Sequence, residues 1–166
     1  MKVGIIGLGL IGGSMAVDLK RKGFADEVIG VEAEPVNAAA AEKIGLVDRM
    51  AGLDQCIGES DLIVLAVPVG AAVKMLPEGL DRFAEAGDEG KIVIDVCSTK
   101  EHLARSVRYH PQRRQYVASR GLHASADGCF AEFHIFCQAS YQGKNLVERR
   151  LHHRSGSGLR RDARFV

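Results

Sequence analysis

Short apolar runs alternate with longer amphipathic or alanine-rich segments over the first 119 residues. Apolar runs bounded by Gly or Pro indicate buried strands, whereas longer segments that end at a glycine indicate helices. Strands are predicted at residues 3–6, 27–32, 61–67, 91–96 and 115–118. Helices are predicted at residues 11–22, 35–44, 71–83 and 98–108. This alternation with short connections predicts an α/β fold with an open, doubly wound and mostly parallel sheet.

A G-x-G-x-x-G motif stands at residues 7–12, directly after the first predicted strand and at the start of the first predicted helix. In a Rossmann-type domain the three glycines allow a tight turn, backbone contact with a pyrophosphate, and close packing of helix on strand. The free amides of the helix N-terminus attract the phosphates. A glycine-rich turn that binds nothing is the alternative, but position and spacing favour dinucleotide binding. The predicted cofactor-binding loop consists of Gly7, Leu8, Gly9, Leu10, Ile11 and Gly12.

Glu32 ends the second predicted strand, 20 residues beyond Gly12. A carboxylate at this point accepts hydrogen bonds from the ribose hydroxyls of NAD and repels the 2′-phosphate of NADP. Ala33 follows, so the next residue is not an arginine that could hold that phosphate. We therefore predict NAD as the cofactor, with a solvated strand-end charge as the alternative interpretation of Glu32.

The bulk composition fits one ordinary domain, with 46% hydrophobic residues, 26% charged residues and a formal net charge of +1. This charge does not indicate a nucleic-acid or membrane partner, and no apolar run reaches the ~20 residues of a membrane span. The four cysteines form neither a C-x-x-C pair nor a zinc-ligand spacing. We predict no metal, reduced thiols and a cytoplasmic location.

The charge balance and the strand–helix pattern both change after residue 119. Residues 1–119 carry 14 Lys and Arg against 17 Asp and Glu, whereas residues 120–166 carry 8 against 4. We predict a cofactor-binding domain at residues 1–119. Residues 120–166 then form an atypical basic tail that is either poorly ordered or the product of a frameshift.

Four segments together resemble the N-terminal half of the prephenate and arogenate dehydrogenases of tyrosine biosynthesis. They are GLGLIGGS at residues 7–14, VIGVE at 28–32, DLIVLAVPV at 61–69 and DVCSTK at 95–100. The resemblance implies NAD-dependent oxidative decarboxylation of a small molecule, prephenate to 4-hydroxyphenylpyruvate, or of arogenate in some relatives. It also implies a homodimer. The family's C-terminal helical domain is absent from these 166 residues, so the sequence leaves the oligomeric state of this chain open.

The resemblance also assigns roles to individual residues. It implies that Ala66, Val67 and Pro68 line the cofactor cleft, and that Ser98 lies near the nicotinamide and the substrate hydroxyl.

Two local interpretations concern the helix after Ser98. Ser98 and Glu101 have the spacing of a capping box, in which each side chain bonds a free amide of the first helical turn. This structural role is compatible with the functional one. Lys100, early in the same helix, is interpreted as a solvated charge, with a place near the substrate or a phosphate as the alternative.

The resemblance fails after the last predicted strand. The family has an H-P-M-A-G-T-E motif there, whose histidine accepts the proton, but Arg120 occupies that position and cannot act as a base at neutral pH. His123, three residues later, is the candidate substitute. Three hypotheses follow: an active dehydrogenase, a non-catalytic NAD-binding fragment of that lineage, or another small-substrate NAD(P) reductase.

Overall fold

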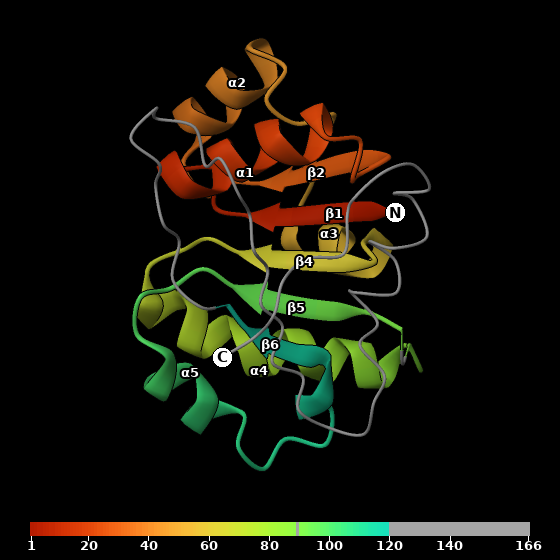
Figure 1. The fold of residues 1–166 in the computed structure, drawn as a ribbon, viewed down its shortest axis with the longest axis vertical. Helices are drawn as coiled ribbons and strands as arrows, with labels where there is room; N and C mark the ends of the chain where they lie inside the picture. Colours follow the sequence, from red (N-terminus) through yellow and green to blue (C-terminus); the bar gives the residue numbers. More distant parts are fainter. Residues whose placement is uncertain (89, 120–166) are drawn as a thin grey trace, which may run out of the picture.

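The computed structural model describes residues 1–88 and 90–119. Helices and strands alternate along this part of the chain, as predicted (Figure 1). In chain order the elements are β1 (Lys2–Ile6), α1 (Leu10–Arg21), β2 (Glu27–Val31), α2 (Pro35–Lys43), β3 (Arg49–Met50), α3 (Leu53–Glu59), β4 (Leu62–Leu65), α4 (Val69–Glu85), β5 (Ile92–Asp95), α5 (Lys100–Ser106), the 3-10 turn η1 (Arg113–Gln115) and β6 (Tyr116–Ala118).

The strands of the described residues form one parallel sheet in the order β3-β2-β1-β4-β5-β6. The order reverses at β1, where Ile5 lies beside Gly30 of β2 on one side and Val64 of β4 on the other. All carboxyl ends lie at the same edge of the sheet, on the left of Figure 1. The predicted doubly wound sheet of Rossmann type is thereby confirmed.

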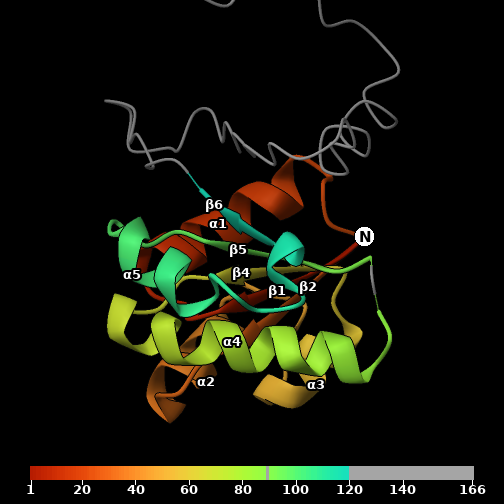
Figure 2. The same ribbon diagram turned by 90° about the horizontal axis from the view of Figure 1, so that it is seen from below.

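Both faces of the sheet are buried, which explains why its strands are almost continuously apolar. Successive residues of β1 enter opposite cores: Ile5 packs in the core that includes Met15 of α1, and Ile6 in the core that includes Phe83 of α4. Figure 2 shows α1 on one side of the sheet and α3 and α4 on the other. The two cores hold β1 and β4 rigidly at the centre of the sheet.

The short elements β3 and α3 were not predicted from the sequence. The two residues of β3 carry no apolar run and pair with β2 at the edge of the sheet. The seven residues of α3 bury only Cys56 and Ile57, too few for helical periodicity to be recognised.

Helix α4 is longer than predicted and continues through Pro77. A proline inside a helix removes one backbone hydrogen bond and normally kinks or ends it. Here Leu76, Leu80 and Phe83 of the same helix are fully buried against the sheet. Tertiary packing of this face outweighs the local cost of the proline.

Candidate functional site

The predicted site residues within the described part of the chain meet at the carboxyl edge of the sheet. Residues 7–12 follow β1, Glu32 follows β2, residues 66–68 follow β4, and Ser98 follows β5. β1 lies between β2 and β4, and the sheet is built outward from β1 in both directions. In open α/β sheets such a reversal of strand order creates the crevice in which ligands bind.

Gly7 and Gly12 are required by close backbone packing. Gly7 has a φ of +92°, a conformation that side chains rarely adopt, and a Cβ there would lie 2.6 Å from the carbonyl oxygen of Ala66. A Cβ on Gly12 would lie 1.9 Å from the carbonyl oxygen of Gly7. The tight turn and the close approach of α1 to β1, the tasks predicted for these two glycines, are both present.

Gly9 differs because no atom of the described residues packs against its open side. Within residues 1–88 and 90–119, a Cβ built on Gly9 would have no packing neighbour within 4 Å. Gly9 is the N-cap of α1, and no side-chain hydrogen bond caps this end of the helix. The first amides of a helix lack partners within the helix, so the space over Gly9 suits an anion that lies close to the backbone.

The apolar residues of the loop play different parts. Leu8 is buried, and its side chain lies so close to β2 that a Cβ on Gly30 would be 2.9 Å from its Cδ1. Leu10 is 86% exposed, and Ile11 is partly exposed. Leu8 thus anchors the loop to the core, while Leu10 and Ile11 begin α1 with exposed side chains.

Glu32 is held beside the loop by two backbone amides. Its Oε2 accepts a hydrogen bond from the Leu8 amide at 2.9 Å, and its Oε1 accepts one from the Glu34 amide at 3.2 Å. The carboxylate therefore has a fixed position next to residues 7–12. This is the position from which the predicted contact with a ribose can be made.

Residues 66–68 follow β4, on the other side of β1 from Glu32. The Ala66 amide donates to the carbonyl of Ile6 at 2.8 Å, which continues the β1–β4 pairing for one residue. A Cβ on Gly7 would lie 2.9 Å from Cγ1 of Val67. Pro68 is the N-cap of α4. Ala66 and Val67 thus pack directly against the glycine loop, and Pro68 begins the next helix.

The predicted capping box at Ser98 is wrong. Helix α5 has Thr99 as its N-cap, and no side chain caps it. Glu101 forms an ion pair with Arg105, one turn further along the helix, instead of reaching back. Ser98 is exposed in the loop between β5 and α5. It is therefore available to a ligand at the carboxyl edge.

A polar cluster beneath Ser98 was not predicted from the sequence. Asp95 is fully buried, and its carboxylate accepts hydrogen bonds from the Cys97 amide at 2.9 Å and from the Tyr116 hydroxyl at 2.7 Å. Lys100 forms an ion pair with the same carboxylate and also donates to Ser119 Oγ at 3.3 Å. The cluster ties the carboxyl end of β5 to that of β6.

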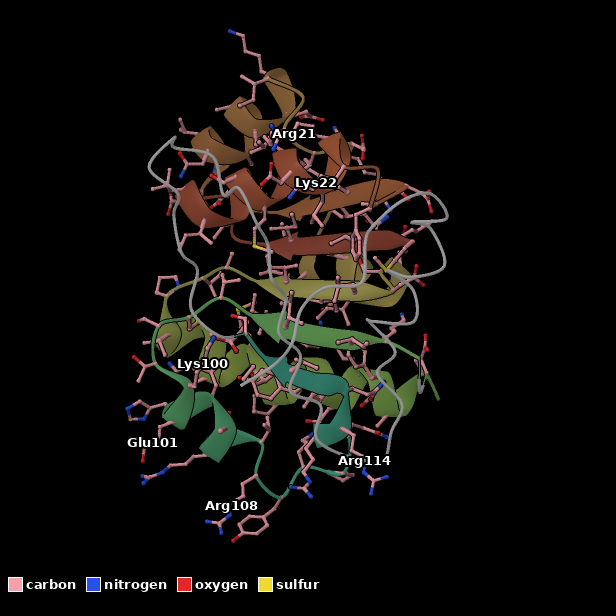
Figure 3. All side chains as sticks on the ribbon, viewed as in Figure 1. Arg21, Lys22, Lys100, Glu101, Arg108 and Arg114 are labelled. Carbon is pink, nitrogen blue, oxygen red and sulfur yellow. The ribbon has the colours of Figure 1, made fainter. Side chains whose placement is uncertain are left out.

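The interpretation of Lys100 as a solvated charge is therefore wrong. Figure 3 shows Lys100 between α5 and the end of β6, with Glu101 on the outer side of the helix. Burial, followed by the hydrogen bond to Asp95, raises the pKa of Tyr116 far above its usual value, so this hydroxyl stays protonated and donates. The DVCSTK segment at residues 95–100 contained the signal, since it places an acid and a lysine on either side of Ser98.

His123 and the predicted tail at residues 120–166 lie outside the described residues. Within residues 1–88 and 90–119, no group of three His, Cys, Asp or Glu side chains could hold a metal ion. In the same residues no helix is both long and apolar enough to cross a membrane.

Comparison with known proteins supplies a family. Residues 15–144 match the family model described as the prephenate dehydrogenase nucleotide-binding domain. The chain is 33% identical over 143 residues to prephenate dehydrogenase from Bacillus subtilis (strain 168), an alignment that covers 82% of this chain and 37% of that protein.

Solved structures show the same fold. A putative prephenate dehydrogenase from Corynebacterium glutamicum is 30% identical, with a TM-score of 0.60 over 75% of this chain and 37% of that one. Prephenate dehydrogenase from A. aeolicus, in complex with hydroxyphenyl propionate and NAD+, is 24% identical, with a TM-score of 0.58 over 71% of this chain and 40% of that one. The present chain thus spans about two fifths or less of the length of these relatives.

Proposed function

Because the chain belongs to the prephenate dehydrogenase family through its nucleotide-binding domain, we propose that it binds NAD and serves the oxidative decarboxylation of prephenate to 4-hydroxyphenylpyruvate. The observation that carries this proposal is the open N-terminus of α1 at Gly9, with the fixed carboxylate of Glu32 beside it. One feature binds phosphates and the other binds a ribose, and both lie at the reversal point of the sheet.

The residues present fit a dinucleotide at the N-terminus of α1. The space over Gly9 would be filled by the Cβ of any other residue, so the glycine leaves room for a pyrophosphate against the first amides of α1. The packed glycines at positions 7 and 12 hold these amides in place. In this proposal, residues 66–68 line the cofactor on the β4 side of the loop.

Glu32 selects NAD over NADP in this proposal. Its two carboxylate oxygens are already oriented by the amides of Leu8 and Glu34. Each oxygen has a further lone pair with which to accept a ribose hydroxyl. A 2′-phosphate at the same place would bring two anions together, which costs binding free energy.

The reaction needs two kinds of help from the protein. When bound, NAD supplies the acceptor for the hydride that leaves the ring carbon bearing the substrate hydroxyl; the ring carboxylate departs as carbon dioxide and the product is aromatic. The protein holds the substrate in line with the cofactor and receives the hydroxyl proton. Ser98, exposed at the end of β5, orients the substrate hydroxyl by a hydrogen bond. His123 is the candidate proton acceptor.

The second candidate function is an NAD-binding module without turnover. It is favoured by Arg120, which stands at the position of the family's proton-accepting histidine. Both candidates use the same crevice, and they differ only in chemistry.

Formation of NADH by the purified chain, followed by absorbance with NAD and either prephenate or arogenate, separates these possibilities. The proposal expects NADH with one of the two substrates and loss of most of that rate in a His123→Asn variant. NAD binding without NADH from either substrate would contradict the proposed reaction and leave the non-catalytic module or a reductase for another small substrate.

A further inference from the structure

We propose that the ion pair of Asp95 and Lys100 is a positioning device for the nicotinamide half of the bound dinucleotide. The pair fixes the β5–α5 loop, which carries Ser98, to the end of β6, and the fixed loop positions the nicotinamide. This inference rests on the proposed NAD binding. It assigns a role to charged groups that the glycine loop and Glu32 do not use.

Lys100 is placed to hold the protein together and has no donor left for a ligand. Its ammonium group carries three N–H donors. It donates to the Asp95 carboxylate, to the Asp95 backbone carbonyl at 3.3 Å and to Ser119 Oγ at 3.3 Å. A lysine that bound a substrate carboxylate or a phosphate directly would have to give up one of these bonds. Lys100 is therefore a positioning residue.

Asp95 is the fixed point to which the loop is tied. Its carboxylate is fully buried, a situation that is stable only with a counter-charge and complete hydrogen bonding. Lys100 provides the charge, and the Cys97 amide and Tyr116 hydroxyl provide further bonds. Ser98 lies between the two charged residues in the sequence. The β5–α5 loop is thus held on both sides of Ser98.

The place of the cluster in the sheet indicates which part of the ligand it serves. A Rossmann sheet consists of two mononucleotide-binding halves related across the reversal point. Glu32 follows β2, in the half formed by β1, β2 and β3, and marks that half for the adenosine ribose. Asp95, Lys100 and Ser119 lie at the ends of β5 and β6, in the other half. The nicotinamide end of NAD belongs there.

A cluster that only stabilised the fold would affect every ligand of the domain equally. A cluster that positions the nicotinamide side affects NAD but not ADP-ribose, which has the same adenosine, pyrophosphate and second ribose without the nicotinamide ring. The ratio of the two affinities therefore distinguishes the two roles.

The test is calorimetric titration of NAD and of ADP-ribose into the wild-type chain and a Lys100→Met variant. We expect the variant to bind NAD about tenfold more weakly, the size of one lost charged hydrogen bond. Its affinity for ADP-ribose should stay within about twofold of the wild type. The matched control is Arg105→Met, which breaks the exposed ion pair with Glu101 on the same helix and should change neither affinity.

Lys100→Met leaves the buried Asp95 carboxylate without its counter-charge, which destabilises the fold. Tyr116→Phe therefore serves as a second, milder variant. It removes one hydrogen bond to Asp95 and keeps the ion pair, so the same asymmetry between the ligands should appear in smaller measure. Equal losses for NAD and ADP-ribose, or no loss in either variant, would overturn the inference while leaving NAD binding intact. A wild-type chain that bound neither ligand would contradict the proposed function itself, and this inference with it.

Discussion

Substitutions of two glycines in the same loop, Gly9 and Gly12, distinguish an effect on cofactor binding from an effect on folding. Among the described residues, a methyl group on Gly9 would meet no packing neighbour within 4 Å, and the residue has a φ of −65° that alanine adopts freely. Because alanine is a poorer N-cap than glycine, we expect Gly9→Ala to lose at most about 1 kcal/mol in the free energy of unfolding. It should bind NAD at least about tenfold more weakly, because the methyl group occupies the space of the pyrophosphate. Thermal melts and NAD titrations measure the two effects.

Gly12→Ala is the matched comparison. Its methyl group would lie 1.9 Å from the Gly7 carbonyl oxygen, so α1 must move away from β1. We expect a loss of about 1–3 kcal/mol in the free energy of unfolding, typical of overpacking. If Gly9→Ala bound NAD as tightly as the wild type, the phosphates would not approach the backbone there.

Helix α5 provides a test of whether Ser98 has a structural role as a helix cap. Because Ser98 does not cap this helix, we expect Ser98→Ala to change the free energy of unfolding by less than about 0.5 kcal/mol. Loss of a true N-cap would cost about 1 kcal/mol. Urea unfolding measures the difference. A loss of about 1 kcal/mol would indicate that Ser98 caps the helix. It would weaken the assignment of Ser98 to the ligand.

The start of helix α5 is set by a contact that the local sequence pattern does not predict. The spacing of Ser98 and Glu101 satisfies the capping pattern, but Lys100 is bound to Asp95 and fixes the first helical residue by a tertiary contact. Strands with long apolar runs, such as that at residues 61–67, were predicted because burial on both faces dictates their composition. β3 and α3 bury too little to leave such a pattern.

The stability of the whole domain in acid depends on a charged cluster at the opposite edge of the sheet. Arg49 of β3 pairs with Glu27 of β2 and with Glu59 of α3. The hydrogen bond from Arg49 lowers the pKa of Glu27, and hydrogen bonds from Gln55 and Arg49 lower that of Glu59, from an ordinary value of 4.5. The half-buried Glu27 and the exposed Glu59 thus join three elements through Arg49.

A carboxyl group whose pKa is lowered by folding stabilises the protein above its unfolded pKa, and that contribution is lost as the pH falls through the folded pKa. We therefore expect the free energy of unfolding to decline as the pH falls below about 4.5. In Arg49→Met the decline should be shallower, because the carboxyl groups lose the partner that lowers their pKa. Urea unfolding at a series of pH values measures the slopes, and equal slopes in the two proteins would contradict this assignment.

For the molecule as a whole, the sequence was sufficient to predict the parallel sheet and the position of the glycine loop, but not the cluster at Asp95. Glycine spacing and the position of Glu32 are local features tied to a known binding geometry. Asp95, Tyr116 and Ser119 meet only because β5 and β6 pair in register, Asp95 beside Ala118. No sequence period encodes such a meeting. The chemistry expected of His123 lies beyond the described residues and stays a prediction.

Calorimetric titration of NAD and NADP into the wild-type chain is the most direct test of cofactor binding by the glycine loop and Glu32. We expect saturable binding of NAD at one site, with NADP at least about tenfold weaker because Glu32 repels its 2′-phosphate. Absence of NAD binding by the folded chain would contradict the assignment of the glycine loop, and equal binding of NADP would contradict the role of Glu32.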